Sequence, residues 1–484
     1  QVLQPLAEVA QQVPEWLQQL GDAARAEVAA EGTTMAATVV RRRMVNLRFR
    51  GQESSLTVEA TAGVSLAQAF AEAYEAVYGH RPSLERSIEV ESLRVVASAP
   101  PMASPVSTAD LPQKSVPSGC RRAWTGADWQ DVRTYERDEL ALGAVVHGPA
   151  LVFEQHSATW VAQGWQLHVD HAGALAMRHV QPAAAPPSQA EAVRLELFTH
   201  SLENGAREMG TLLQRTALST NVKDRLDFSC ALLDADGRLV VNAPHIPVHL
   251  GALGVCVRAV AATLDLAPGD TAITNDPGFG GSHLPDITLV TPIHTDTGRL
   301  LGYAASRAHH AEIGGSRPGS MPPAATRLSE EGVIIVPQLL VAAGVPRWQD
   351  IRRLLEAGPY PSRAPEDNLA DLEAALAANH RGRRHLQELA ARHDADEVGR
   401  YMSALREEAA RGVRAALLRL DDGRYRARAR LDDGAVIAVC IEVAEDRARI
   451  DFNGSSPVHA GNLNATPAIV QSAVMYVLRL LVEK

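Results

Sequence analysis

Cysteine is scarce in this sequence of 484 residues, which contains only four. They stand far apart, at Cys120, Cys230, Cys256 and Cys440, and no two of them form a Cys-x-x-Cys pair. This spacing excludes a zinc ribbon and the disulfide framework that stabilises small secreted domains. The cysteines therefore predict a protein of the reducing cytoplasm.

Long apolar runs and an excess of positive charge are also absent. No stretch of about 18 uncharged apolar residues is present to span a membrane, because the nearest candidate, 473–482, contains Arg479. Acidic residues interrupt the first 30 positions, so a signal peptide is not predicted. The formal net charge of -10 argues against nucleic acid and anionic membranes as partners, since both select basic surfaces.

Two common catalytic motifs are missing as well. There is no Gly-x-x-x-x-Gly-Lys-[Ser/Thr], and the glycine-rich segment 277–281 lacks the lysine that contacts nucleotide phosphates. There is no Gly-x-Ser-x-Gly, and segment 315–319 has Arg317 where the nucleophilic serine would stand. The sequence thus excludes a Walker-type ATP site and a nucleophile-elbow hydrolase.

What is present predicts a multidomain chain of mixed α/β (α+β) class, with about three domains for its length. The proline-rich segment 182–188 is typical of a linker. We therefore predict a first part, 1–181, that ends in a small β-rich domain, a linker at 182–189, and a large mixed α/β domain, 190–484. Periodicity predicts helices at 1–30, 67–78, 191–217, 249–264 and 366–417, the last broken near Gly382 and His393, and strands at 38–61, 88–97, 143–180, 230–242, 271–274 and 424–452.

The candidate site lies between Asp270 and Gly315, where His283 and Asp286 are followed by the pair His309 and His310. Strands at 287–293 and 300–304, joined by a turn at 296–298, would form a hairpin that brings the two clusters together. Imidazole and carboxylate groups that converge in this way are typical ligands of an open divalent-metal site. The alternative is that the glycines form tight turns and the histidines are hydrogen-bonded structural residues.

A second histidine pair, His245 and His249, is spaced four apart, as ligands on one helix face would be. Pro247 between them disfavours a regular helix. The pair is therefore either part of the same site or two hydrogen-bonded core residues.

Several ordered motifs after the linker resemble the hydantoinase B/oxoprolinase family. The motifs are Leu226 to Gly237, His245 to Gly251, Pro268 to Asp270, Asn275 to Pro277, Gly280 to Asp286, Ser306 to Gly315, Pro318 to Pro322, and Glu331 with Gly332. Before the linker, Arg50 to Gln52, Tyr78 with Gly79, Glu89 to Arg94 and Gly148 to Glu154 resemble the C-terminal part of the hydantoinase A family. This order is similar to the fused, single-chain ATP-dependent 5-oxoprolinases.

The resemblance implies a cytoplasmic hydrolase that opens a small cyclic amide, 5-oxo-L-proline, to L-glutamate. An upstream actin-like half would bind Mg-ATP and phosphorylate the amide oxygen, so this chain would be incomplete alone and truncated at its C-terminus, within a homo-oligomer. The alternatives are an acetone- or acetophenone-type carboxylase and a non-catalytic assembly half. The resemblance also implies that His283, Asp286 and one of His309 or His310, with His309 favoured, are catalytic and bind Mn, Zn or Mg.

Overall fold

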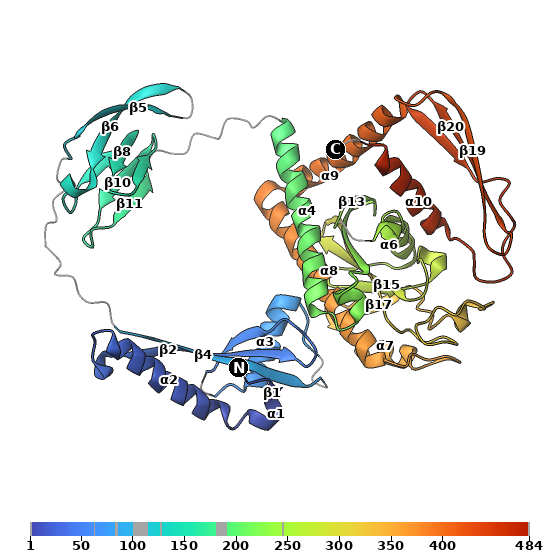
Figure 1. The fold of residues 1–484 in the computed structure, drawn as a ribbon, viewed down its shortest axis with the longest axis horizontal. Helices are drawn as coiled ribbons and strands as arrows, with labels where there is room; N and C mark the ends of the chain where they lie inside the picture. Colours follow the sequence, from blue (N-terminus) through green and yellow to red (C-terminus); the bar gives the residue numbers. More distant parts are fainter. Residues whose placement is uncertain are drawn as a thin grey trace. The chain divides into compact units, whose positions relative to one another are not determined.

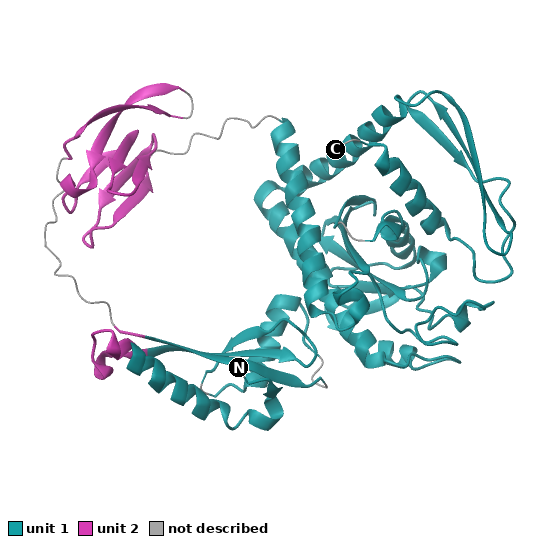
Figure 2. Ribbon diagram, in the orientation of Figure 1, with its two compact units in different colours: residues 1–27, 40–97, 191–484 teal, residues 28–39, 98–190 magenta. Residues whose placement is uncertain are grey.

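The computed structural model describes residues 2–61, 63–82, 86–99, 115–125, 128–180, 191–243 and 246–482. The chain divides into two compact units (Figure 2): residues 1–27, 40–97 and 191–484 form unit 1, and residues 28–39 and 98–190 form unit 2. Sheets in both units, together with the α-helices of unit 1, confirm the predicted multidomain, mixed α/β class. The predicted linker lies outside the described residues, and the predicted domain boundaries stay a prediction.

Unit 2 is a small β domain, as the short strands predicted between 143 and 180 indicated. A four-stranded sheet has the order β5-β6-β8-β9, and a three-stranded sheet has the order β11-β10-β7. Their bounds are β5 Gly119–Trp124, β6 Trp129–Glu136, β7 Val145–His147, β8 Ala150–Phe153, β9 Ala158–Val161, β10 Trp165–Val169 and β11 Leu175–His179. Alternate apolar residues of these strands, such as Val152, Val161 and Leu167, form its core.

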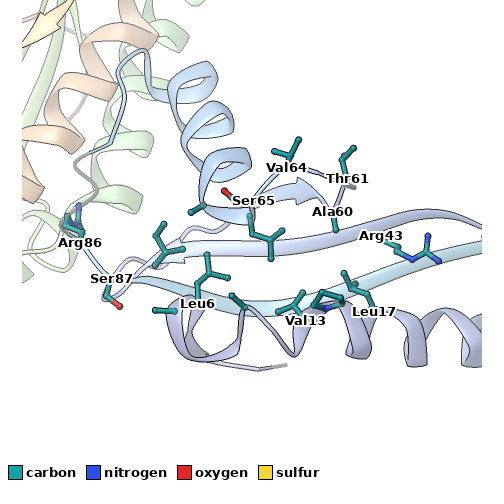
Figure 3. A pocket seen from close by; sticks show the side chains of 16 residues that line it. Leu6, Val13, Leu17, Arg43, Ala60, Thr61, Val64, Ser65, Arg86 and Ser87 are labelled. Carbon is teal, nitrogen blue, oxygen red and sulfur yellow. The ribbon is translucent and has the colours of Figure 1, made fainter.

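The first 97 residues add a four-stranded sheet of order β1-β4-β2-β3. The elements are β1 Gln4–Pro5, α1 Leu6–Val9, α2 Val13–Ala30, β2 Val39–Phe49, β3 Leu56–Glu59, α3 Leu66–Tyr78 and β4 Ile88–Ser98. Helix α3 begins where the Ser65 hydroxyl accepts a hydrogen bond from the Gln68 N–H, and it ends at Gly79, whose φ is +78°. A groove of about 890 Å³ between these elements is mostly apolar, with Arg43 and Arg86 at its edge, and holds no cluster of ligating groups (Figure 3).

The central sheet of unit 1 lies between α8 (Pro365–His393) and α6 (Ala252–Thr263), as Figure 1 shows. It has seven strands, all antiparallel, in the order β13-β12-β16-β15-β14-β17-β18. The strands are β12 Phe228–Asp234, β13 Leu239–Asn242, β14 Thr271–Thr274, β15 Asp286–His294, β16 Leu300–His309, β17 Gln338–Ala342 and β18 Val345–Pro346. Helices α4 (Glu191–Thr216) and α8 cover one face. Helix α6 covers the other, so both faces of the central strands are buried.

The predicted break near Gly382 is wrong, because α8 continues through this residue to His393. A Cβ atom at Gly382 would lie 2.4 Å from the Met209 sulfur on α4. The glycine therefore lets two long helices approach closely, and the packing outweighs the loss of helix propensity of about 1 kcal/mol. The predicted break at His393 and Asp394 is confirmed, since Asp394 has a φ of +72° and caps the next helix.

Unit 1 also contains several elements besides the central sheet and the helices that cover it. They are α5 Thr220–Lys223, α7 Trp348–Leu355, α9 Ala395–Leu417, β19 Gly423–Arg430, β20 Val436–Ala444, β21 Arg447–Asp451 and α10 Pro467–Leu480. Strands β19, β20 and β21 form the predicted meander. Among the described residues, no helix has the length and apolar character needed to cross a membrane.

Polar contacts join the first 97 residues to the rest of unit 1. Arg86 donates to the carboxylate of Glu373 at 2.9 Å, and Gln52 donates to the Thr216 carbonyl at 3.0 Å. The side chain of Glu373 is 3% exposed, so this ion pair is almost fully removed from water. Breaking a buried pair leaves an unpaired charge, so these contacts fasten the two segments together.

Candidate metal centre

Strand register brings the predicted site residues together. Strand β16 does not end at Ala304 but continues to His309, where it lies directly opposite Asp286 at the start of β15. On its other side, the His309 N–H donates to the Asp227 carbonyl at 2.9 Å. His309 therefore lies between Asp286 on β15, which the predicted hairpin places there, and Asp227, the residue directly before β12.

Alternation along β16 separates the two adjacent histidines. Successive side chains of a strand point to opposite faces of the sheet. His309 faces Asp286, whereas the His310 ring nitrogen Nδ1 lies 3.1 Å from the Asn368 amide nitrogen on α8, on the other face. Burial lowers the pKa of His310, which keeps this imidazole neutral in the core. His310 thus lies away from the cluster, and His309 is the member of the pair that enters it.

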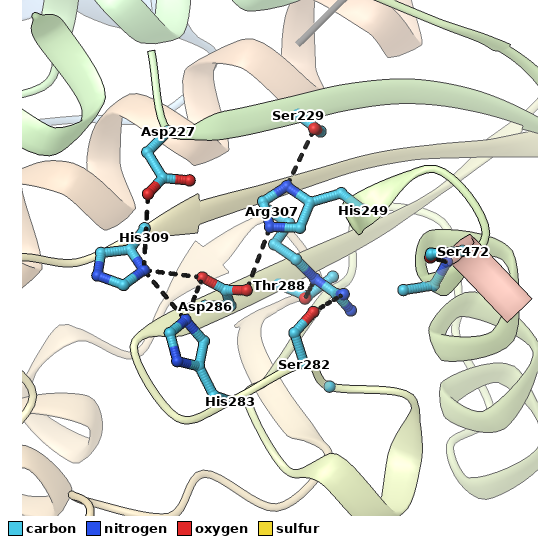
Figure 4. Close-up of polar contacts among 12 residues, drawn as sticks. Asp227, Ser229, His249, Ser282, His283, Asp286, Thr288, Arg307, His309 and Ser472 are labelled. Atoms are coloured by element: carbon cyan, nitrogen blue, oxygen red, sulfur yellow. Dashed lines mark hydrogen bonds and ion pairs between the residues drawn. The ribbon is translucent and has the colours of Figure 1, made fainter. Parts of the chain in front are cut away.

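Three ligating atoms form a nearly equilateral triangle (Figure 4). The His283 Nε2 atom lies 3.0 Å from Asp286 Oδ1 and 3.1 Å from His309 Nδ1, and the last two atoms are 3.1 Å apart. The Asp286 side chain is 3% exposed, whereas that of His283 is 35% exposed. The triangle therefore has a buried carboxylate side and one side that opens to solvent.

His249 contacts the Asp286 carboxylate oxygen that faces away from the triangle, Oδ2. The His249 Nε2 atom lies 3.1 Å from Asp286 Oδ2, and its Nδ1 atom lies 3.0 Å from the Ser229 hydroxyl. Burial alone would raise the pKa of Asp286, but hydrogen bonds from His249, His283 and His309 outweigh it and lower the pKa well below its usual value. The Asp286 carboxylate is therefore ionised and held in one orientation, as an oxygen ligand of a metal would need to be.

Carboxylates lie close to His283. Burial would lower the pKa of His283, but the hydrogen bond and charge of Asp286, with smaller effects of Asp227 and Glu331, raise it. The Asp227 carboxylate also lies 3.8 Å from His309 Nδ1 and is 32% exposed. A group of carboxylates that favours a proton on its imidazole also favours a metal cation that replaces the proton.

The spacing of the triangle suits a metal ion with open positions. Two ligand atoms that bind one ion at about 2.1 Å lie about 3.0 Å apart when they subtend 90°, and about 3.4 Å apart at the tetrahedral angle. The observed separations of 3.0 and 3.1 Å match the first case. Two imidazoles and a carboxylate on one octahedral face are a known donor set for a metal that keeps free positions for substrate and water.

A fully buried arginine supports the loop that carries His283. Arg307 lies two residues before His309 on the same face of β16 and is 0% exposed. Its guanidinium donates to the Thr288 hydroxyl, the Ser282 hydroxyl and the Gly280 carbonyl at 2.8 to 2.9 Å. Since no carboxylate pairs with it among the described residues, these neutral acceptors stabilise the charge and fix the loop.

We expect Arg307→Lys to lower the affinity for divalent metal about tenfold, although no ligand is changed. Lysine keeps the charge but cannot donate in three fixed directions, so the loop that carries His283 loses its support. Competition with a chelating dye measures the affinity. Arg299→Lys, at a side chain that is 54% exposed, is the matched control. Equal affinities of the two variants would contradict the role of Arg307, provided that both melt cooperatively.

Sequence reasoning found His283, Asp286 and His309, and it left His249 open. The structure brings His249 to Asp286, while His245 lies outside the described residues. Asp227 and Arg307 were not identified as site residues. Both belong to motifs that were noted, and the order β12-β16-β15 is the signal that places them beside His309.

Comparison with known proteins relates the whole chain to one group. The model of the hydantoinase B/oxoprolinase family matches residues 191–484, and that of the hydantoinase/oxoprolinase C-terminal domain matches residues 4–180. The 5-oxoprolinase of Saccharomyces cerevisiae is 35% identical over 477 residues, which are 92% of this chain and 37% of that protein. The chain thus spans about a third of the length of the curated relatives it matches.

Two solved structures are similar. The ATP-dependent caprolactamase of Pseudomonas jessenii is 30% identical with a TM-score of 0.56, covering 60% of this chain and 51% of that one. A nucleotide-free acetone carboxylase is 18% identical with a TM-score of 0.54, covering 63% of this chain and 42% of that one, which shows a shared fold. With more than half of its residues matched by the family model, this chain belongs to the hydantoinase B/oxoprolinase family.

Proposed function

We propose that this chain is the metal-binding part of an ATP-dependent cyclic amide hydrolase that opens 5-oxo-L-proline to L-glutamate. The observation that carries the proposal is the triangle of His283, Asp286 and His309, with sides of 3.0 to 3.1 Å. The substrate is inferred from the yeast 5-oxoprolinase, which matches 92% of the chain. Family matches on both sides of the predicted linker also support a fused enzyme.

His283, Asp286 and His309 would hold one divalent ion. Bound there, the ion would polarise an oxygen or lower the pKa of a bound water. Of the predicted candidates, Mn and Zn suit two imidazoles better than Mg, which prefers oxygen ligands. Asp227, 3.8 Å from His309 Nδ1 and partly open to solvent, is positioned either to complete the ligand set or to accept a proton.

His249 and Arg307 would position these groups. His249 orients the Asp286 carboxylate through its second oxygen, and Arg307 fixes the loop that leads to His283. Each acts through a residue of the triangle and has no need to contact the substrate. This arrangement leaves the exposed side of His283 free for a small cyclic amide.

We place Mg-ATP on an upstream, actin-like hydantoinase A-type half of the complete enzyme, because this sequence has no Walker motif. Calorimetric titration of the chain alone with Mg-ATP should then show no specific binding. A micromolar dissociation constant for Mg-ATP would contradict the proposal that the upstream half alone binds ATP. Assembly as a homo-oligomer and a cytoplasmic location are part of the same proposal.

The test uses the complete enzyme with its ATPase half present. 5-Oxoproline should stimulate ATP cleavage and yield glutamate, because phosphorylation of the lactam oxygen makes the ring carbon electrophilic. His283→Ala should abolish glutamate formation, while His200→Ala, at an exposed position on α4, should preserve it.

Acetone or acetophenone with bicarbonate should not stimulate ATP cleavage. Carbon fixation from bicarbonate, together with no response to 5-oxoproline, would instead support a carboxylase. This is the second candidate, because the chain shares its fold with an acetone carboxylase. Normal glutamate formation by His283→Ala would support the third candidate, a non-catalytic assembly role for this chain.

A further inference from the structure

A small cavity of about 90 Å³ lies in unit 1 where the end of α3 meets the central sheet and α8. Tyr78, Gly79 and His80 line it from the N-terminal segment. The opposite wall consists of Gly269, Thr271, Thr291, Val341, Gly344, Leu376, His380 and Arg383. Gly79 approaches so closely that a Cβ atom there would lie 2.0 Å from the His380 ring. Packed elements therefore form the walls of the cavity, and none of its lining residues belongs to the metal centre.

Arg383 brings an unneutralised positive charge to this cavity. Within the described ranges it forms no ion pair with a carboxylate, although its neighbours Arg381 and Arg384 on α8 both pair with Glu388. Arg383 donates to His380 Nδ1 at 2.8 Å, so this histidine is an acceptor and stays neutral. Burial, with smaller effects of the Arg383 and Arg384 charges, lowers the pKa of His380 to about 4, so this imidazole does not add a charge to the cavity.

His80 contributes a buried acceptor without a partner. The ring is 4% exposed, and Nδ1 lies 3.2 Å from the Tyr78 carbonyl, which can only accept, so Nδ1 carries the proton. The Nε2 atom is then a lone-pair acceptor, and it has no hydrogen-bond partner among the residues that the structure describes. An unsatisfied buried polar atom of this kind destabilises the fold unless a group in the cavity donates a hydrogen bond to it.

We propose that this cavity binds a small protonated oxyanion, of the hydrogen phosphate or hydrogen carbonate class. Its anionic oxygens would accept from the Arg383 guanidinium, and its O–H group would donate to His80 Nε2. A water molecule occupies about 30 Å³, so a cavity of about 90 Å³ accommodates one such anion or about three waters. Sulfate, which carries no proton at neutral pH, satisfies Arg383 but not His80.

The experiment is calorimetric titration of protein freed of metal by a chelator and then dialysed, so that oxyanions cannot bind at the metal centre. Phosphate, hydrogen carbonate and sulfate are titrated separately at pH 7 and constant ionic strength in sodium chloride. We expect one site per chain for phosphate or hydrogen carbonate, and the stronger of the two identifies the physiological class. Sulfate should bind at least about tenfold more weakly, since it leaves His80 unsatisfied.

The matched variants are Arg383→Gln and Arg384→Gln, on adjacent residues of one helix. Arg383→Gln should weaken binding by about tenfold or more, and Arg384→Gln, whose side chain is 51% exposed, should change it less than about twofold. If Arg383→Gln does not fold, the proposal is tested by comparing the affinities of the unaltered protein for phosphate and for sulfate. Equal affinity for these two anions, equal effects of the two variants, or no binding below about 10 mM would each overturn the proposal.

Discussion

Elemental analysis of protein purified without chelator is expected to find about one divalent ion per chain, and His283→Ala should reduce this content to background. The three ligand atoms lie within 3.1 Å of one another, so each contributes to a single ion. Removal of one of three protein ligands should weaken binding by more than about 100-fold, beyond the 10- to 100-fold typical of residues that only support ligands.

Two histidine variants make this result specific. His310→Gln changes the residue next to His309 but on the opposite face of the sheet, where it contacts Asn368. His200→Gln changes an exposed histidine of α4. Both should retain the ion, although His310→Gln should unfold more easily because it is buried. Equal metal content in wild type and His283→Ala, or its loss from His310→Gln while the fold persists, would exclude the site.

The free energy of unfolding is expected to fall by about 3 kcal/mol between pH 6.5 and pH 4 because of His80 alone. Burial of this imidazole lowers its pKa from 6.5 to about 4, with an opposing contribution from the Tyr78 carbonyl. Between these values the unfolded state binds a proton at His80 that the folded state excludes. The stability that the protein gains from keeping His80 neutral is therefore fully present above pH 6.5 and is lost as the pH falls towards 4.

The measurement is urea unfolding at several pH values in buffers without phosphate or bicarbonate, so that the cavity proposed above receives no anion. His80→Gln should be less sensitive to pH than the wild type by about 3 kcal/mol across the window. His200→Gln, which changes a histidine that is 66% exposed, should follow the wild type. If the His80→Gln and wild-type curves run parallel, His80 does not control acid stability.

The sequence was sufficient to predict the hairpin that forms the site. Its turn residues and alternating apolar strands are local signals, and the structure has strands Asp286–His294 and Leu300–His309 with Asp286 opposite His309. Composition alone could not choose between His309 and His310. The choice depends on register, because a shift of one residue would exchange the faces of both side chains.

Helix α8 is a case in which a local sequence signal gave a wrong prediction. Glycine in a helix is a local signal for a break, and Gly382 predicted one that the structure does not contain. Packing outweighed the low helix propensity of Gly382. The Met209 side chain, 173 residues away in sequence, occupies the space that a side chain at position 382 would fill. No window along the sequence holds this information, since it arises from two helices that meet only after folding.

The motifs of the sequence identified the family, and periodicity and turn chemistry, which are local properties, identified the mixed α/β class. The sequence also placed His283 and Asp286 in the candidate site, but from the residues alone it left His309 and His310 as alternatives. Only the tertiary structure decided that Asp227 and His249 lie beside these residues and that Arg307 is buried below them. The same holds for the oxyanion cavity, whose walls come from segments about 300 residues apart. Proximity across strands and helices depends on packing, and a linear pattern records it only where neighbours in space are also neighbours in sequence.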